Sequence, residues 1–253
     1  MVTLNQDQWN LVYNVFSFGL ISMLACTVYT LVSQARVLPK YRNALVMSSM
    51  VTFIAGYHYW RIFNSFSESS DMMKVNISGA EGSFNEAYRY VDWLLTVPLL
   101  LVEVIAVLAL AKEVSKSLIM RLVPASAAMI ALGYPGEIST DQNTQVIYGV
   151  LSTLPFLYIL YVLFVELTKS LDRQPAGVAD TVKRLRLLLI ATWGVYPISY
   201  ILGMGAGDPT ADQFVGVQVG YTIADILAKC VFGLTILKIA RMKSHAEGMA
   251  ADH

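Results

Sequence analysis

Charged side chains are scarce in this sequence of 253 residues: Asp, Glu, Lys and Arg together make up 14% of it, and the formal net charge is zero. So little charge excludes an ordinary soluble domain, and the zero balance gives no electrostatic reason to expect a nucleic acid partner. Hydrophobic residues make up 56% of the chain, and the mean hydropathy is +0.55. This composition is typical of a membrane protein.

Cysteine is also rare, because the chain holds only Cys26 and Cys230. Each lies in an apolar run without a CxxC motif or a nearby histidine, which predicts buried free thiols rather than a disulfide or a metal site. The first eight residues lack the positive charges that open a secretory signal peptide, so we expect no cleavable signal.

Apolar runs of about twenty residues, the length that crosses a bilayer, recur along the whole chain. We expect an all-α membrane protein in which residues 1–253 form one domain of seven transmembrane helices. The link over 65–84 contains a short alternating run and then glycines, a pattern compatible with a small β-hairpin. The predicted spans are 9–34, 41–64, 85–111, 116–136, 142–168, 179–204 and 212–240.

Lysine and arginine are concentrated in alternate links. They occur in the first, third and fifth links and in the C-terminal tail, whereas the second, fourth and sixth links are acidic. The positive-inside rule therefore predicts a multi-pass protein of the plasma membrane with its C-terminus in the cytoplasm and its N-terminus outside. The basic residues are Arg36, Lys40, Arg42, Lys112, Lys116, Arg121, Lys169, Arg173, Lys183, Arg184, Arg186, Lys238, Arg241 and Lys243.

The seventh predicted span contains a lysine, Lys229, and an aspartate one helical turn earlier, Asp225. A lysine so deep in an apolar run is costly unless it is paired or chemically modified. One interpretation is a salt bridge within the helix. The other is an amine that forms a Schiff base, with a carboxylate to balance its charge.

The third predicted span carries four polar residues, Arg89, Asp92, Thr96 and Glu103, at spacings that place them on one helical face. Glu103 lies about 16 Å along the helix axis from Asp92. Two carboxylates in line, on either side of the membrane centre, suit a proton relay. The alternative is a polar stripe that holds helices together, although packing stripes favour serine, threonine and small residues.

The segment Arg-Tyr-Val-Asp-Trp-Leu-Leu-Thr-Val-Pro-Leu-Leu over 89–100, with Glu103 behind it and Asp-Ile-Leu-Ala-Lys over 225–229, resembles the microbial (type 1) rhodopsins. The similarity is greatest to the proton pumps related to proteorhodopsin and xanthorhodopsin. It implies that Lys229 carries all-trans retinal as a protonated Schiff base. Asp92 would be counterion and proton acceptor, Glu103 the proton donor, and Asp225 the second counterion.

The same resemblance implies further roles. Arg89 would lie on the outward proton path, and Thr96 is the middle residue of the motif. A lone histidine in an apolar span is more often structural, but His58 matches the histidine that pairs with the acceptor aspartate. A hydrogen bond from His58 would alter the proton affinity of Asp92 and couple the two titrations.

A retinal pocket is expected between the helices. Trp193, Tyr196 and Tyr200 follow the helical spacing and form one wall, Pro197 permits a bend beside them, and Trp93 forms another wall. The leucine at position 100 matches the residue that tunes colour in proteorhodopsins and implies green absorption. By resemblance the remaining pocket residues are Leu100, Met129, Gly133, Ser152, Thr153 and Phe156.

Gly149 departs from the archaeal pumps, which carry a tryptophan at this place. The missing bulk is compatible with a lateral window through which a hydroxylated carotenoid could approach the retinal ring as a light-harvesting antenna. The alternative is close helix packing at a small residue. The archaeal pair of release-site glutamates is absent at the start of the seventh span, over 214–218. The sequence therefore does not identify the group that releases the proton on the outer side.

These features predict a light-driven outward proton pump, which is not an enzyme. Its expected partners are the lipid bilayer, protons and further copies of itself, with no soluble protein partner implied. The main alternative is a sensory rhodopsin, although sensory members usually lack an acid at the position of Glu103. The Asp-Thr-Glu motif disfavours a sodium or a chloride pump. A ligand-activated seven-helix receptor would carry Asp-Arg-Tyr and Asn-Pro-x-x-Tyr motifs, which this sequence lacks.

Overall fold

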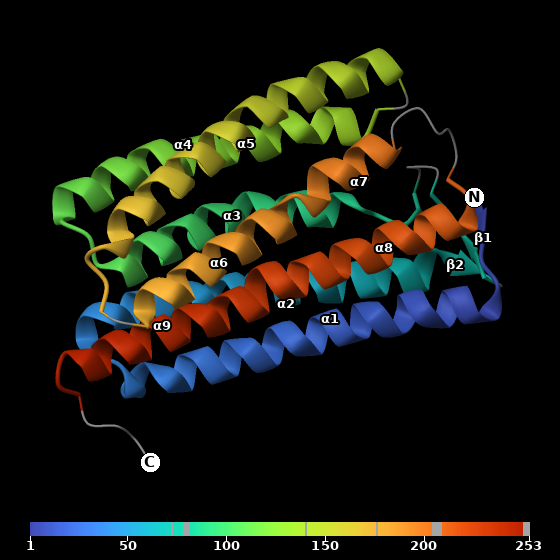
Figure 1. Ribbon diagram of the computed structural model, residues 1–253. Helices are drawn as coiled ribbons and strands as arrows, with labels where there is room; N and C mark the ends of the chain where they lie inside the picture. The colour runs from blue at the N-terminus through green and yellow to red at the C-terminus, as the bar shows by residue number, and fades with distance from the viewer. Residues whose placement is uncertain (72, 78–80, 140, 176, 204–208, 250–253) are drawn as a thin grey trace.

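The computed structural model describes residues 1–71, 73–77, 81–139, 141–175, 177–203 and 209–249. Within these ranges, seven long helical segments lie side by side in an elongated bundle, with α1 beginning at one end and α9 finishing at the other (Figure 1). The predicted seven-helix fold is therefore confirmed. In chain order the elements are β1 (Val2–Thr3), α1 (Gln6–Val32), η1 (Ser33–Arg36), α2 (Pro39–Ser69), β2 (Ser70–Asp71), β3 (Lys74–Val75), α3 (Ala87–Leu108), α4 (Lys112–Glu137), α5 (Gln142–Leu171), α6 (Val178–Trp193), α7 (Val195–Gly203), α8 (Ala211–Asp225), η2 (Ile226–Val231) and α9 (Phe232–Ala246).

Side-chain caps set the start of two spans. Asn5 accepts a hydrogen bond from the backbone N–H of Gln8 at 2.8 Å, and its own N–H donates to the Gln8 side chain at 2.9 Å. This capping box starts α1 three residues before the predicted position. Thr210 and Gln213 form the same arrangement at the start of α8.

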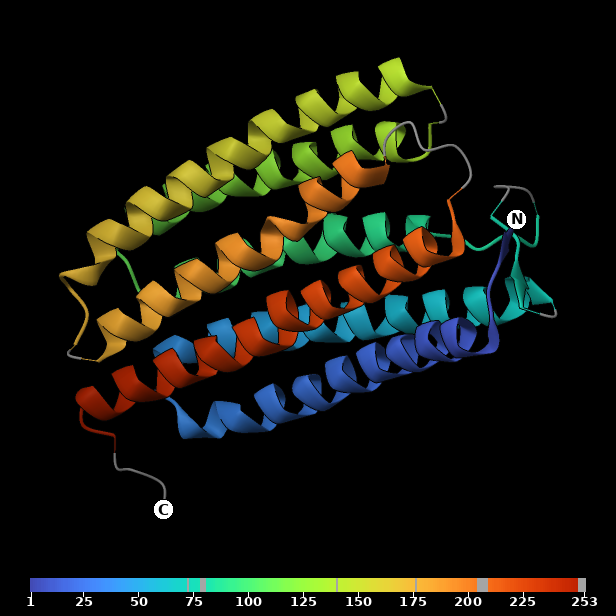
Figure 2. The same ribbon diagram turned by 45° about the vertical axis from the view of Figure 1, so that its right-hand side comes forward.

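The sixth predicted span consists of two helices, α6 and α7, which meet at Gly194 (Figure 2). Pro197 has no backbone N–H to donate to the carbonyl of Trp193, so the helical hydrogen bonding is interrupted one turn before the proline. Residue 204, the predicted end of this span, lies outside the described residues.

The seventh predicted span is continuous but changes its winding. Between α8 and α9, the turn η2 has π-helical geometry, and it contains Lys229. Single π-helical turns inside α-helices are rare and often occur at functional sites. This turn was not predicted.

A small sheet covers the end of the bundle where the chain starts. The predicted hairpin is present as β2 and β3, which pair antiparallel with Ser70 opposite Val75. The strand β1 adds to the other edge of β3, with Val2 also opposite Val75, and this third strand was not predicted. Residues 72 and 78–80 of the predicted hairpin link lie outside the described part of the chain.

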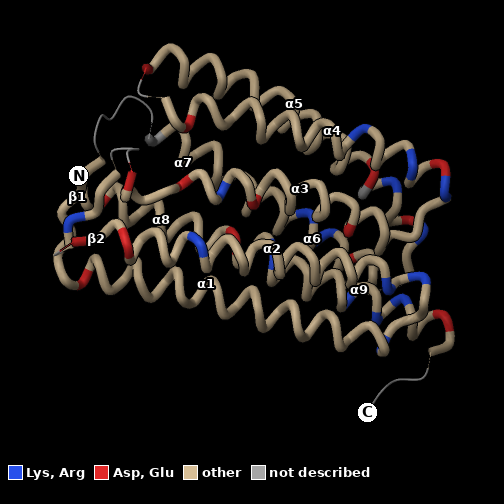
Figure 3. Tube along the Cα trace, turned by 180° about the vertical axis from the view of Figure 1, so that it is seen from behind, with Lys and Arg blue, Asp and Glu red and all other residues tan. Residues whose placement is uncertain are grey.

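Most lysines and arginines gather at the end of the bundle opposite this sheet (Figure 3). Four described helical segments are by themselves long and apolar enough to cross a membrane, namely Gln6–Arg36, Ala87–Leu108, Lys112–Glu137 and Gln142–Leu171. The distribution of charge agrees with the pattern read from the links.

Candidate functional site

The ammonium group of Lys229 lies between two carboxylates in the middle of the bundle. Its Nζ donates to Oδ2 of Asp92 at 2.6 Å and to Oδ1 of Asp225 at 2.8 Å. All three side chains are buried, with 3% or less of each exposed. Asp225 and Lys229 share one helical face, as their spacing predicted, and form a salt bridge, while α3 supplies the second acid. A buried cation of this kind is stable only because it is paired.

Asp225 is held by three aromatic side chains from three different helices. The hydroxyl of Tyr59 donates to its Oδ2 at 2.9 Å, and the hydroxyl of Tyr196 donates to its Oδ1 at 2.6 Å. The indole N–H of Trp93 lies 3.4 Å from Oδ1. This shell orients Asp225 and leaves it little freedom to move.

Asp92 is less constrained. Its Oδ1 has no hydrogen-bond partner among the described residues, and the Thr96 hydroxyl donates to its backbone carbonyl at 2.8 Å rather than to its carboxylate. Nδ1 of His58 is 3.8 Å from Oδ1 of Asp92 and 2.9 Å from the carbonyl of Ile54. The structure thus brings His58 beside Asp92, as predicted, without a hydrogen bond between them.

Glu103 is fully buried, and neither carboxylate oxygen has a hydrogen-bond partner among the described residues. A Cβ placed on Gly233 would overlap the Ser48 hydroxyl and come within 3.8 Å of the Glu103 carboxyl. Ser48 and Gly233 therefore lie beside Glu103. A charge without a partner is very unfavourable in such a place. We therefore expect Glu103 to hold a proton as a neutral acid.

Arg89 lies on the other side of Asp92, toward the sheet. Arg89 is 3% exposed, and its guanidinium rests against two rings, with 5.7 Å to the centre of Phe16 and 5.3 Å to the centre of Tyr221. Its Nη2 donates to the side chain of Gln218 at 2.5 Å. Gln218 had no predicted role.

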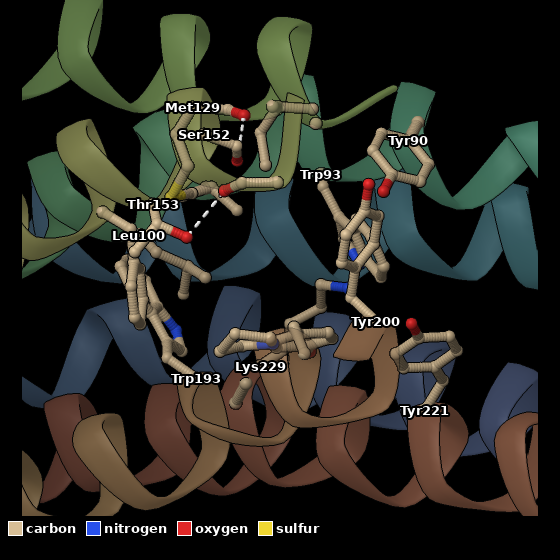
Figure 4. Close-up of a pocket in the computed structure, with 18 residues that line it drawn as sticks. Tyr90, Trp93, Leu100, Met129, Ser152, Thr153, Trp193, Tyr200, Tyr221 and Lys229 are labelled. Carbon is tan, nitrogen blue, oxygen red and sulfur yellow. Dashed lines mark hydrogen bonds between the residues drawn. The ribbon is translucent and has the colours of Figure 1, made fainter. Parts of the chain in front are cut away.

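A cavity with mostly apolar, aromatic walls adjoins Lys229 (Figure 4). The close-up shows Trp193 on one side of Lys229 and Trp93, Tyr200 and Tyr221 on the other. Every residue that was predicted for the pocket lines this cavity. They are Trp93, Leu100, Met129, Gly133, Gly149, Ser152, Thr153, Phe156, Trp193, Tyr196, Pro197, Tyr200 and Lys229.

Five lining residues were not predicted: Tyr90, Val97, Ile130, Tyr221 and Ala228. For two of them a signal was present, because Tyr90 and Val97 are three residues before and four residues after Trp93 and so share its helical face.

Gly149 and Thr153 of α5 form part of the cavity wall. A Cβ placed on this glycine would lie 2.8 Å from the ring of Tyr200, so the tyrosine occupies the space that a larger residue would fill. Gly149 is partly exposed on the outer surface of α5, and Thr153, one turn further along, is exposed and also lines the cavity. The cavity therefore reaches the lateral surface of the bundle here.

Taken together, the site consists of an amine, two carboxylates and an aromatic cavity. A lysine amine forms a Schiff base with a carbonyl compound, and the cavity suits a long apolar molecule attached to it. The two carboxylates would balance the positive charge that such a linkage keeps when protonated.

The family model for bacteriorhodopsin-like proteins matches residues 10–242. The chain therefore belongs to this family of seven-helix membrane proteins, the microbial rhodopsins. Among curated relatives, the green-light absorbing proteorhodopsin of Gamma-proteobacterium EBAC31A08 is 31% identical over 92% of this chain and 88% of its own length.

Two solved structures superpose over nearly the whole chain. Xanthorhodopsin, described as a light-driven ion pump with dual chromophore, has a TM-score of 0.91 and 43% identity, and the match covers 99% of this chain and all of that one. A thermophilic rhodopsin has a TM-score of 0.91 and 41% identity, with 98% and 100% covered.

Proposed function

We propose that this protein is a light-driven outward proton pump that carries all-trans retinal on Lys229 as a protonated Schiff base. One observation carries the proposal: Nζ of Lys229 lies 2.6 Å from Asp92, while a second buried acid, Glu103, lies on the same helix toward the opposite end. The relatives named above, a proteorhodopsin and a light-driven ion pump, support the same activity.

The residues present fit retinal. Lys229 supplies the amine, and Trp93, Trp193 and Tyr196 supply flat apolar walls for a conjugated chain. When bound, retinal supplies light absorption and a light-driven change of shape at the Lys229 nitrogen.

The protein's own groups then move the proton. The proton at Nζ of Lys229 passes to Oδ2 of Asp92, whose other oxygen has no hydrogen-bond partner in the described structure and leaves this acid free to respond. Asp225 stays ionised because two tyrosine hydroxyls and Lys229 donate to it. Glu103 returns a proton to Lys229 from the other side. Since Asp92 lies nearer the predicted outer end of α3, the net movement is outward.

Cells that express the protein with added retinal test this directly. Under green light they should acidify an unbuffered medium, and a protonophore should abolish the signal. Lys229→Ala should give neither pigment nor signal. A stable pigment without a pH change would reject the pump and favour a photosensor. Alkalinisation of the medium would show that protons move inward and would contradict the outward direction.

We also propose that a hydroxylated carotenoid can lie against the wall at Gly149 and Thr153 and pass light energy to retinal. The support is that Gly149 and Thr153 both line the cavity and reach the outer surface of α5, and that xanthorhodopsin is described with a dual chromophore. A carotenoid added to membranes should give a new band in the action spectrum of pumping, and Gly149→Trp should remove that band. An action spectrum that follows retinal alone would contradict the antenna.

We further propose that residues 1–253 form one retinal-binding domain in the plasma membrane, with the N-terminus outside, and that copies of it associate. Chemical cross-linking in native membranes should yield discrete oligomers. Protease digestion of intact cells should leave the C-terminal tail uncut.

A further inference from the structure

Between Arg89 and the sheet end of the bundle, three side chains form a continuous chain of hydrogen bonds. Nη2 of Arg89 donates to Oε1 of Gln218 at 2.5 Å, and Nε2 of Gln218 donates to Oε1 of Glu86. Gln218 is fully buried, whereas Glu86, the residue just before α3, is partly exposed. The chain thus leads from the buried arginine to the surface.

Donor and acceptor chemistry fixes the direction of this chain. Arginine can only donate, so the amide oxygen of Gln218 must face Arg89, and its NH₂ group must face Glu86. A carboxylate is the strongest acceptor for that group, and the positive charge of Arg89 lies just beyond it. This arrangement holds the Gln218 amide between the Arg89 guanidinium and the Glu86 carboxyl group.

Two other groups face Glu86 closely enough for their charges to interact with it. They are Glu137 at the end of α4 and Tyr221 on α8, in addition to Arg89. Glu137 is a second acid at this end and accepts a hydrogen bond from Tyr90 at 3.3 Å. Glu137 has no hydrogen bond to Arg89 or Gln218 among the described residues, so it stands outside the chain.

We propose that Glu86 is the group through which the transported proton leaves, and that Gln218 is a positioning residue that ties it to Arg89. This rests on the proposed pump function. The carboxylate of Glu86 binds the proton that Asp92 gives up and then loses it to the outer solvent, so both groups return to their starting state. Because Glu86 receives its proton from Asp92, which gives it up last, release follows proton uptake by Glu103 in each cycle.

Flash-induced pH transients, read with an indicator dye, test the order and the rate. In the wild-type protein, uptake should precede release. Glu86→Gln should keep the pigment and the uptake step but slow release by about 100-fold, the lower end of what a positioned acid or base contributes. Glu86→Asp, which keeps a carboxylate, should recover most of the rate. Glu137→Gln is the matched control: it removes a neighbouring acid outside the chain and should change the release rate far less than Glu86→Gln does.

Infrared difference spectra give an independent readout. A carboxylic acid band that appears late in the wild-type cycle should be missing in Glu86→Gln and present in Glu137→Gln. Unchanged release in Glu86→Gln, or loss of the band in Glu137→Gln instead, would overturn the assignment. A wild-type pigment that moves no protons would instead remove the pump function itself, so the two failures are distinguishable.

Discussion

Lys229 and Asp92 are 137 residues apart in the chain, yet Nζ of the lysine lies 2.6 Å from Oδ2 of the aspartate. Asp225 holds the same nitrogen from the other side. With Arg89 nearby, two positive and two negative groups are buried together, and their formal charges cancel. The charge state of any one of them therefore affects the other three.

Asp92→Asn should abolish transport and leave a pigment with a shifted absorption maximum. The variant removes the acceptor but keeps Asp225 as a partner for Lys229. Because the buried charges no longer cancel, we also expect up to about 3 kcal/mol less stability, the lower end of the cost of breaking a buried pair. Absorption spectra, pH recordings and thermal bleaching check this. Asp71→Asn, at an exposed acid, should behave as wild type, and continued pumping by Asp92→Asn would remove the acceptor assignment.

Glu103→Gln should give a normal pigment whose recovery after a flash is slowed by about 100-fold, as expected when a positioned proton donor is lost. Its thermal stability should not fall, since neither oxygen of Glu103 has a hydrogen-bond partner among the described residues. Flash photolysis and melting curves measure both. The control is Glu113→Gln, at an exposed acid near the same end of the bundle. Equal recovery in the two variants would show that Glu103 is not the donor.

Gly19→Ala should disturb the site from a distance. A Cβ there would lie 2.8 Å from the ring of Tyr59, whose hydroxyl donates to Asp225. We expect a loss of about 1–3 kcal/mol from overpacking, together with a shifted absorption maximum. Gly216→Ala, where nothing lies within 4 Å of the added Cβ, should be neutral or slightly stabilising. Thermal bleaching that gave the same midpoint for both variants would contradict this account.

Lys243, beyond the predicted seventh span, should make stability rise with pH. Its Nζ donates to the carbonyls of Val107 and Leu108 at the end of α3. Burial lowers the pKa of Lys243 from 10.5 to about 8. Between these values the unfolded chain binds a proton that the folded chain does not, so the free energy of unfolding increases with pH across this window.

Melting curves in detergent from about pH 8 upward, across that window, measure the slope. Lys243→Gln should reduce it, whereas Lys238→Gln, at an exposed lysine on the same helix, should not. A slope that survives in Lys243→Gln would place its origin elsewhere.

The spans and the aromatic wall of the pocket could be predicted because they depend on local pattern, whereas the other pocket residues were predicted from the resemblance to a family. Long apolar runs and helical spacing mark which residues lie on one face, and the motifs over 89–103 and 225–229 identify the family. Pairing between distant segments has no such local signal. The strand β1 has two residues, and it pairs with β3 because α2 brings the chain back to the end of the bundle where α1 starts.

The hydrogen-bonded chain from Arg89 through Gln218 to Glu86 was missed for the same reason. Its members come from α3, α8 and the segment before α3, and no spacing along the sequence relates Gln218 to Glu86. The sequence could predict that His58 lies near Asp92, but not which group its ring bonds to. Whether the imidazole donates to the acid or to the carbonyl of Ile54 depends on a ring orientation that sequence does not encode.

The π-helical turn η2 has a consequence for how the chain tolerates insertions and deletions. Such a turn holds one residue more than a regular α-helical turn, so α8 and α9 are out of step by one position. Deleting one residue from this turn would let the helix continue as a regular α-helix, with α8 and α9 keeping their faces toward the bundle. A deletion elsewhere in α8 or α9 would instead rotate one half against the other by about 100°. A deletion scan scored by pigment formation should therefore find deletions at positions 230 and 231, just after Lys229, better tolerated than deletions in the regular parts of α8 and α9.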